Sequence, residues 1–291
     1  MSGPLAALLW GLFGGGLIGG SDAVARFTAR RASLGALFLA IMGLSTVALA
    51  AYLGATGAWP AWSPYGWGAS AVSGLLNLVA LGFLYVALAR GPVSVASPSA
   101  ASFAAILVGI NAAAGAPITW AQAGAMALVF LGVVMLARPD RSDLGRYDAA
   151  HLRVTALLGL GTAATVSVRM FLAQEAATDL EPLSALFLNR VFATIGAVGL
   201  VAWEAGRARF AAPGRGAVPA VLLQAALETG ALFVFLLGSA DAGRVGATIG
   251  FATFPAWTAL AAWIAYRDPV GARRALWIGA VIAGAALAAL G

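Results

Sequence analysis

Two ionisable side chains lie inside stretches of the chain that are otherwise apolar. Glu228 lies near the middle of LQAALETGALF (223–233), and Arg190 lies within LSALFLNRVFATIGAVGL (183–200). A carboxylate in an apolar surrounding can take up and release a proton, whereas a guanidinium keeps its charge and needs a partner. Two interpretations stay open: Glu228 is a permanent ion-pair partner of Arg190, or it exchanges its proton for a substrate. Both residues are therefore candidates for proton coupling.

The sequence contains few residues that could support enzyme catalysis or metal binding. The single histidine, His151, lies in a charged loop, and the chain has no cysteine, no pair of carboxylates within one apolar stretch and no nucleophile elbow. All seventeen basic residues are arginines, so the lysine of a phosphate-binding P-loop is missing. We therefore expect no enzymatic activity, no metal and no cofactor.

The composition places these residues in a membrane. Hydrophobic residues make up 62% of the 291 and charged residues 10%, which leaves too little polar surface to cover a soluble globule. Most apolar stretches have about the 20 residues that a helix needs to cross a bilayer. We predict an all-α integral membrane protein with ten transmembrane helices, at about 4–24, 34–54, 68–89, 94–114, 120–138, 154–172, 183–203, 217–238, 245–265 and 275–290.

The arginines indicate how the chain is oriented. Fourteen of them lie in or beside the loops that follow odd-numbered spans, whereas Arg244 alone lies in an even-numbered loop. Positive charge concentrates on the cytoplasmic side of membrane proteins, so we expect both termini outside a cell inner (plasma) membrane. Because orientation explains the net charge of +6, the charge does not indicate a nucleic-acid partner. The lipid bilayer is the expected partner of the membrane-spanning helices.

Short motifs recur at a fixed distance along the chain. Gly91-Pro92-Val93 follows the third span and Gly243-Arg244-Val245 follows the eighth, 152 residues later. Pro117 and Pro269, which precede the fifth and tenth spans, are also 152 residues apart. A repeat of five helices enters the membrane in opposite senses in its two copies, which gives an inverted pair related by a pseudo-two-fold axis.

This repeat predicts where a substrate would bind. We divide the chain into a first five-helix repeat, 1–145, and a second, inverted five-helix repeat, 146–291, which together form one membrane domain. Inverted repeats allow two similar states, each open to one side, with a site between the halves near the midplane. A small-molecule substrate is therefore the expected ligand.

Polar, aromatic and proline residues near that midplane are the candidates for substrate binding. Asn77 and Thr229, next to Glu228, are related by the 152-residue shift. Pro98 and Pro255 each remove a backbone hydrogen bond within a span, either as a packing kink or as a break that lines the site. The candidate residues are Trp10, Asn77, Tyr85, Ser97, Pro98, Ser102, Thr229 and Thr253. For Asn77 the alternative is a structural hydrogen bond, and for Trp10 and Tyr85 it is packing.

Two further features have structural interpretations. Gly11, Gly15 and Gly19 leave one face of the first span almost without side chains, which favours close helix packing. Arg169 is close to the outer end of the sixth span, where its long side chain can reach the membrane surface and needs no function.

Two stretches resemble the drug/metabolite transporter superfamily, in its EamA-like branch. The stretch LYVALARGPVSVASPSAASFAAILVGINAAAGAPITWAQAGAMALVFLGVVML (84–136) has Ala-Leu-x-x-Gly-Pro-x-Ser, a proline in the next span and Gly-x7-Gly. The stretch 183–200 is similar to the seventh helix of that family, with its arginine at Arg190. The resemblance implies a ten-helix exporter of amino acids or similar metabolites.

The sequence thus favours a secondary transporter. We expect it to move a small organic metabolite, an amino acid or similar amphiphile, across the membrane by alternating access, as proton-coupled export. The alternatives are a membrane-embedded enzyme, for which catalytic residues are scarce, and a structural membrane subunit, which does not need an inverted repeat.

Overall fold

The structure is a computed structural model that describes residues 3–29, 31–90, 99–136, 148–240, 243–266 and 272–288. Within these ranges every regular element is a helix, and no strand is formed. Six helices are long and apolar enough to cross a membrane. A helix pairs its own backbone groups, which is why an apolar chain takes this form in lipid. The predicted all-α architecture is confirmed at this level.

The helices follow the predicted apolar stretches. Helix starts carry recognisable signals: Ser33 accepts a hydrogen bond from the backbone N–H of Ala36, and Asp148 accepts one from that of His151. In chain order the elements are α1 (Pro4–Thr28), α2 (Leu34–Thr56), α3 (Pro64–Arg90), α5 (Phe103–Ala113), α6 (Trp120–Leu136), α8 (Ala149–Leu180), α9 (Pro182–Gly206), the 3-10 helix η1 (Arg215–Ala217), α10 (Val218–Gly238), α11 (Arg244–Phe251), α12 (Phe254–Tyr266) and α13 (Ala272–Ala288).

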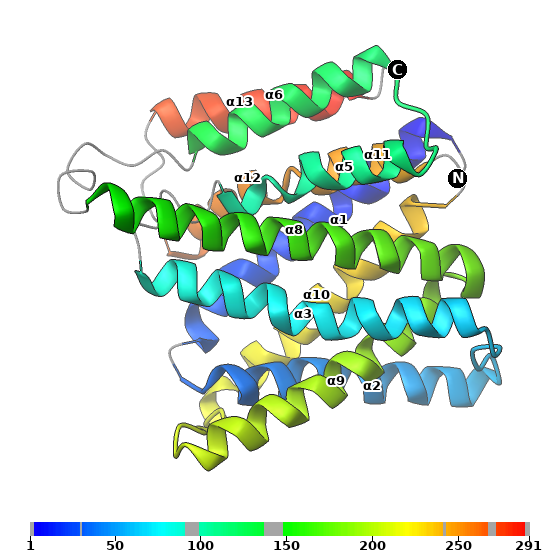
Figure 1. The fold of residues 1–291 in the computed structure, drawn as a ribbon, viewed down its shortest axis with the longest axis vertical. Helices are drawn as coiled ribbons and strands as arrows, with labels where there is room; N and C mark the ends of the chain where they lie inside the picture. Colours follow the sequence, from blue (N-terminus) through cyan, green and yellow to red (C-terminus); the bar gives the residue numbers. More distant parts are fainter. Residues whose placement is uncertain are drawn as a thin grey trace.

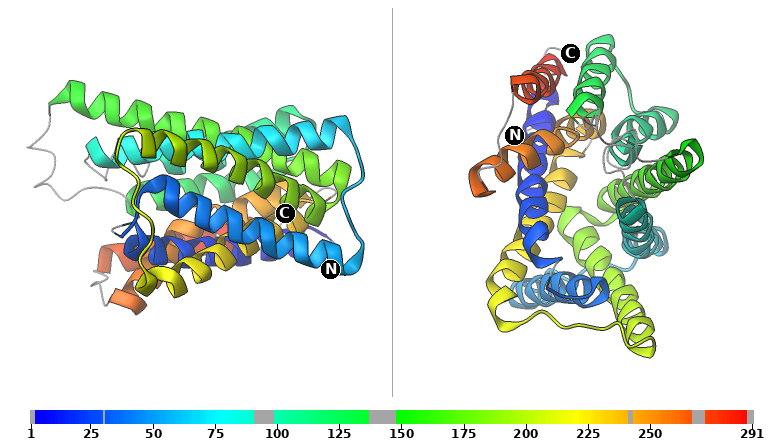
Figure 2. Two further views of the ribbon diagram at one scale, coloured as in Figure 1. Left: turned by 90° about the horizontal axis from the view of Figure 1, so that it is seen from below. Right: turned by 90° about the vertical axis from the view of Figure 1, so that its left-hand side faces the viewer.

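The long helices run side by side and alternate in direction (Figure 1). One group, which we call the first wall, consists of α1 packed against α10, α11 and α12. The second wall consists of α8 packed against α3 and α5. The end-on view of Figure 2 shows α1 and α10 along one side of the molecule and α3 and α8 along the other, with α2 and α9 below. Helices α2 and α9 pack against each other, as do α6 and α13.

The helical structure is interrupted between α11 and α12, where the sequence has a proline within a predicted span. Two residues, Ala252 and Thr253, separate the helices, and Pro255 is the second residue of α12. The hydroxyl of Thr253 donates to the carbonyl of Gly250 at 2.7 Å, so that this polar backbone group is satisfied at the break. The aromatic ring of Phe251 lies 5.1 Å from that of Phe235 and holds the end of α11 against α10. Of the two interpretations of Pro255, a kink or a break, the structure thus has a break, just before the proline.

The glycines of α1 bring its backbone against α11 and α12, as expected. A Cβ atom at Gly11 would lie 2.2 Å from the carbonyl oxygen of Ala247, and one at Gly19 would lie 2.7 Å from the backbone nitrogen of Thr258. Because both neighbours are backbone atoms, neither can move aside cheaply. The first wall therefore depends on the absence of side chains along this face of α1.

We predict that Gly11→Ala separates α1 from α11 and lowers stability by about 1 to 3 kcal/mol, the usual cost of forcing a methyl group into a packed interface. Gly16→Ala is the matched control, because a Cβ there would be 3.9 Å from its nearest neighbour, in Trp257. The apparent melting temperature in detergent measures both variants. Equal melting temperatures for the two variants would contradict the close contact.

Candidate functional site

Four charged side chains from four different helices gather inside the bundle. They are Asp22 of α1, Arg169 of α8, Arg190 of α9 and Glu228 of α10, and each interacts electrostatically with at least one of the others. At 1.5 Å per residue, Arg169, Arg190 and Glu228 lie about 12 to 16 Å along their helices from the ends next to Leu180, Pro182 and Gly238. Three of the charges are therefore at one level near the middle of the helices.

Arg190 is buried, with 1% of its surface exposed. Its Nη2 group donates to the main-chain carbonyl of Glu228 at 3.1 Å, and Nη1 contacts the sulfur of Met42 at 3.1 Å. Its Nε has no hydrogen-bond partner. In the described part of the chain, no carboxylate lies within ion-pair distance of this guanidinium. The guanidinium thus keeps donor capacity in the interior of the protein.

The ion pair between Arg190 and the carboxylate of Glu228, one of the two interpretations that the sequence left open, is not formed. The two residues do meet, but through the backbone of Glu228, because α9 and α10 are rotated so that Arg190 faces the main chain of α10. The half-buried carboxylate of Glu228 has no hydrogen-bond partner in the described ranges. It is therefore available to a proton or to a ligand.

Arg169 does not fit the expectation that it extends to the membrane surface. The residue is half-buried, and its Nε is buried without a hydrogen-bond partner. Ser73 of α3 donates to the main-chain carbonyl of Arg169 at 2.8 Å and accepts a hydrogen bond from Asn189 at 2.8 Å. Since Asn189 precedes Arg190, this serine joins α8 and α9 where the two arginines lie.

Asp22 is a site residue that the sequence interpretation missed. Its carboxylate accepts a hydrogen bond from the hydroxyl of Thr258 at 3.1 Å, across the contact of α1 with α12. The predicted first span ended at about residue 24, which made Asp22 look like part of a polar helix end. In the structure α1 continues to Thr28. The sequence AVARFT contains no helix breaker, and this was the signal for a longer helix.

Hydroxyl groups join α2 to its neighbours beside this cluster. Ser45 and Thr229 share a hydrogen bond of 2.5 Å, and Thr46 and Thr194 share one of 2.9 Å. A cavity of about 730 Å³ lies between α2, α9 and α10. Its walls are largely apolar, and they include Leu44, Ser45, Leu49, Leu186, Thr229 and Phe233. This pocket is open, and Thr229, the neighbour of Glu228 in the chain, lines it, whereas the four charged side chains do not.

The remaining residues predicted to bind substrate do not form one group in the structure. Asn77 is buried, with 6% exposed, and its Nδ2 lacks a partner. The hydroxyl of Ser102 donates to the carbonyl of Ser99 at 2.6 Å. Thr253 stabilises the α11–α12 break, and Trp10 packs against α10 at Gly238. Tyr85 belongs to α3, but its side chain is outside the description, and Ser97 and Pro98 lie outside the described residues.

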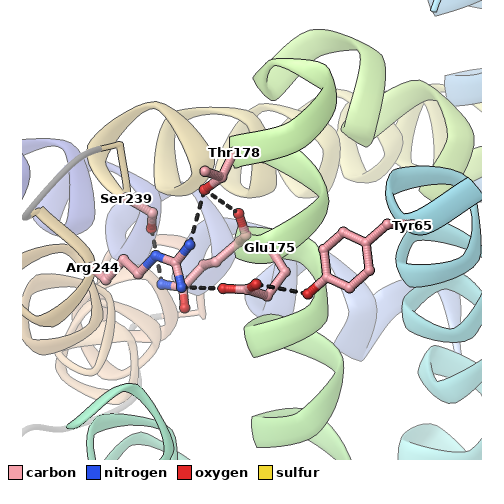
Figure 3. Close-up of polar contacts among 6 residues, drawn as sticks. Tyr65, Glu175, Thr178, Ser239 and Arg244 are labelled. Carbon is pink, nitrogen blue, oxygen red and sulfur yellow. Dashed lines mark hydrogen bonds and ion pairs between the residues drawn. The ribbon is translucent and has the colours of Figure 1, made fainter. Parts of the chain in front are cut away.

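A second polar cluster, the Arg244 cluster, joins the two walls at one end of the molecule (Figure 3). Arg244 of α11 forms an ion pair with Glu175 of α8 and donates to the hydroxyl of Thr178 at 2.9 Å. The hydroxyl of Tyr65 in α3 donates to the other oxygen of Glu175 at 2.7 Å. The residue before Glu175, Gln174, donates to Ser239, just after α10, at 3.0 Å.

Comparison with known proteins identifies the fold but not a family. No protein-family model and no curated protein matches the sequence. A solved crystal structure is similar over 98% of each chain, with a TM-score of 0.77 and 18% identical residues. At that identity the similarity shows that this chain adopts a known fold.

Proposed function

We propose that this chain is a secondary transporter of the inner membrane. It moves a small organic metabolite, an amino acid or similar amphiphile, by alternating access and exports it in exchange for protons. In this proposal the chain is an EamA-like member of the drug/metabolite transporter superfamily, with ten spans arranged as two inverted repeats. The observation that carries the proposal is the symmetry of its helix contacts.

The contacts repeat when the two halves of the chain are exchanged. The exchange pairs α1 with α8, α2 with α9, α3 with α10, α5 with α11–α12, and α6 with α13. It turns the contact of α1 with α10 into that of α8 with α3, and the contact of α1 with α11–α12 into that of α8 with α5. The contacts of α2 with α9 and of α6 with α13 map onto themselves. A pseudo-two-fold axis between the halves accounts for this pattern.

The helix bounds support the same relation. A shift of 152 residues places Trp120–Leu136, which is α6, on Ala272–Ala288, which is α13. The same shift places the end of α1, Thr28, on the end of α8, Leu180. Because the paired helices start or end at corresponding positions, similar backbone arrangements can form in either sense. This is what a carrier needs in order to open to each side in turn.

The charged cluster and the open apolar pocket lined by Thr229 support an amphiphilic substrate. Glu228, whose carboxylate is without a partner in the described ranges, is the group that we assign to proton exchange. The apolar walls of the pocket between α2, α9 and α10 could contact the apolar part of the substrate. A proton and a positively charged substrate group compete for the same carboxylate, which couples the two movements.

The Arg244 cluster closes one end of the path between the walls in this account. Arg244 and Ser239 belong to the first wall, and Glu175 and Gln174 belong to α8 of the second. At the opposite end, Thr28 of α1 bonds to Gln224 of α10 at 2.8 Å and His151 of α8 to the carbonyl of Arg90 at 2.9 Å, each within one wall. Ser33, just before α2, bonds to Glu204 of α9 at 2.6 Å, and these two helices belong to neither wall. These contacts support the inference that the Arg244 end is the closed end.

We predict that Arg244→Gln opens that end. The chain has no cysteine, so a single Gln174→Cys reports access without background. Gln174 is 1% exposed, and its replacement removes the bond to Ser239 but keeps the Arg244–Glu175 ion pair, so a membrane-impermeant maleimide should label the cysteine slowly. Adding Arg244→Gln should raise the labelling rate about tenfold or more, since loss of the charge-assisted bonds costs about 1.5 to 3 kcal/mol. Arg153→Gln, an exposed change elsewhere, should leave the rate unchanged. Unchanged labelling with Arg244→Gln would exclude the cluster as a closing contact.

Transport by the purified protein in liposomes tests the proposed function. Vesicles with an imposed pH gradient are offered labelled amino acids, sugars, nucleosides and amphiphilic amines. A transporter accumulates at least one of these solutes above the level in protein-free vesicles, and collapse of the gradient abolishes the accumulation. A protein that binds or converts a solute without moving it across the bilayer is not a carrier.

A further inference from the structure

The two interior arginines have a property that proton exchange at Glu228 does not require. Arg190 is 1% exposed and Arg169 is half-buried, and the Nε groups of both are buried without partners. Burying a guanidinium is costly unless its donors and its charge are compensated. In the described residues neither guanidinium has a carboxylate within ion-pair distance. Glu228 interacts electrostatically with both arginines, so the described residues compensate their charge only in part.

The two arginines are held near each other by the fold. Ser73 bonds to the carbonyl of Arg169 and to the side chain of Asn189, the neighbour of Arg190. The close approach of α3 and α9 allows this bridge, because a Cβ at Gly74 would lie 2.5 Å from the carbonyl oxygen of Asn189. Both arginines are at the same level of the bundle as Glu228, as their positions along the helices show.

The charges of Arg169, Arg190 and Glu228, which lie at one level of the bundle, indicate how much positive charge is uncompensated there. Arg169 and Arg190 contribute two positive charges and an ionised Glu228 one negative charge, which leaves one positive charge uncompensated. Asp22 interacts with Glu228 but with neither arginine, and it lies about 27 Å from the start of α1, about two to three turns further along the bundle, so it is not counted here. One singly charged oxyanion would neutralise this level, whereas a doubly charged phosphate would reverse its sign.

We propose that Arg169 and Arg190 form the site that takes the carboxylate group of the transported substrate, with Asn77 as a neighbouring amide donor. A guanidinium presents a fork of N–H groups that matches the two oxygens of a carboxylate. The buried Nδ2 of Asn77, on the neighbouring helix α3, has no partner. This inference rests on the proposed transport function and adds the chemical class of its substrate.

A site made of the two arginines predicts opposite pH dependences of binding for zwitterions and for carboxylates without an amine. In a zwitterion, the ammonium group competes with a proton at Glu228 while the carboxylate binds the arginines, so binding tightens as pH rises. A plain carboxylate has no such group, and protonation of Glu228 raises the net positive charge that attracts it, so binding tightens as pH falls. The other charges around Glu228 are Asp22 on α1, Arg169 on α8 and Arg190 on α9.

Matched ligands test the proposal by the thermal stability of the purified full-length protein. Three sets are used: alanine with ethylamine and propionate, leucine with isoamylamine and 4-methylpentanoate, and phenylalanine with phenethylamine and 3-phenylpropionate. Within a set the side chain is constant, and only the carboxylate or the amine is removed. We expect stabilisation by carboxylate-bearing members, with no stabilisation by the matching amine.

Variants connect the binding to the arginines. Arg169→Gln and Arg190→Gln should each weaken carboxylate binding about tenfold or more, the effect of losing a charge-assisted hydrogen bond. Arg153→Gln, which changes an exposed arginine, should bind like the wild type. Inorganic phosphate at the same concentration should stabilise less than the best carboxylate.

Several results would overturn the assignment. They are stabilisation by amines alone, stronger stabilisation by phosphate, carboxylate binding that is unchanged in both arginine variants, and no stabilisation by any carboxylate of the three sets. Transport of a solute without a carboxylate would leave the carrier function intact and remove this inference. Carboxylate binding without any flux into liposomes would support the site and remove the carrier function.

Discussion

Glu228→Gln is expected to abolish accumulation of substrate against its gradient while leaving the protein folded. Glutamine has the shape of the protonated carboxyl group but cannot release a proton. With one proton exchanged per substrate, a difference of one pH unit corresponds to about 1.36 kcal/mol and drives about a tenfold concentration ratio. The variant should reach a ratio of about one under the same gradient, because only downhill exchange remains.

The measurement is accumulation of labelled substrate in liposomes across a series of imposed pH differences. The pH dependence of substrate binding should disappear in the same variant. Thr229→Ser is the matched control: it changes the next residue and keeps the hydroxyl that contacts Ser45. A Glu228→Gln protein that still accumulates substrate with the pH dependence of the wild type would exclude Glu228 as the coupling residue.

Arg190→Met should remove transport without lowering stability. The guanidinium is buried and has no ion-paired carboxylate in the described ranges, so its replacement leaves no buried carboxylate behind. In soluble proteins, well-packed hydrophobic residues in place of buried ion pairs are neutral or stabilise by about 1 to 4 kcal/mol. The thioether can pack against Met42, which already contacts Arg190. We expect an unchanged or higher melting temperature together with loss of substrate binding.

The same position distinguishes charge from geometry. Arg190→Lys keeps the positive charge and loses the planar fork, so it should retain the fold and lose most of the affinity. If Arg190→Met instead melts several degrees lower and still transports at the wild-type rate, the guanidinium has a structural role. That result would remove Arg190 from the site and leave Glu228 to be tested alone.

Features that depend on backbone geometry could be predicted from the sequence. The glycines of α1 indicated close packing before its partners were known, and Gly11 does contact the backbone of α11. Pro255 indicated a break, because a proline cannot donate the hydrogen bond that a continuous helix needs. Both signals act through the chain itself, so they do not depend on which neighbour a helix has.

The directions of the side chains could not be predicted. In a soluble helix the polar face identifies the side towards water, but lipid and protein interior are both apolar, so little periodicity marks which face is inward. Arg169 was therefore expected at the membrane surface, and Asp22 was overlooked. The rotation of α9 and α10, which brings Arg190 to the backbone of Glu228, is likewise set by tertiary packing.

The Arg244 cluster shows the same limit at longer range. Arg244 was visible in a loop between predicted spans, and its charge was used only to orient the chain, whereas Glu175 and Tyr65 were given no role. Their contact joins positions 69 residues apart, for Arg244 with Glu175, and 110 residues apart, for Tyr65 with Glu175. Only the packing of the first wall against α8 brings them together.

Access to the middle of the bundle from both sides tests alternating access most directly, because it needs neither the substrate nor the coupling ion. Asn77→Cys in the cysteine-free chain places one thiol beside the candidate site, about 20 Å along α3 from Pro64. Oriented membrane vesicles are treated with an impermeant maleimide from one side or the other. The account predicts labelling from each side, with Arg244→Gln favouring the side on which Arg244 lies. Alternating access would be contradicted if the cysteine were labelled from only one side, and from that same side in both the protein with Arg244 and the Arg244→Gln variant.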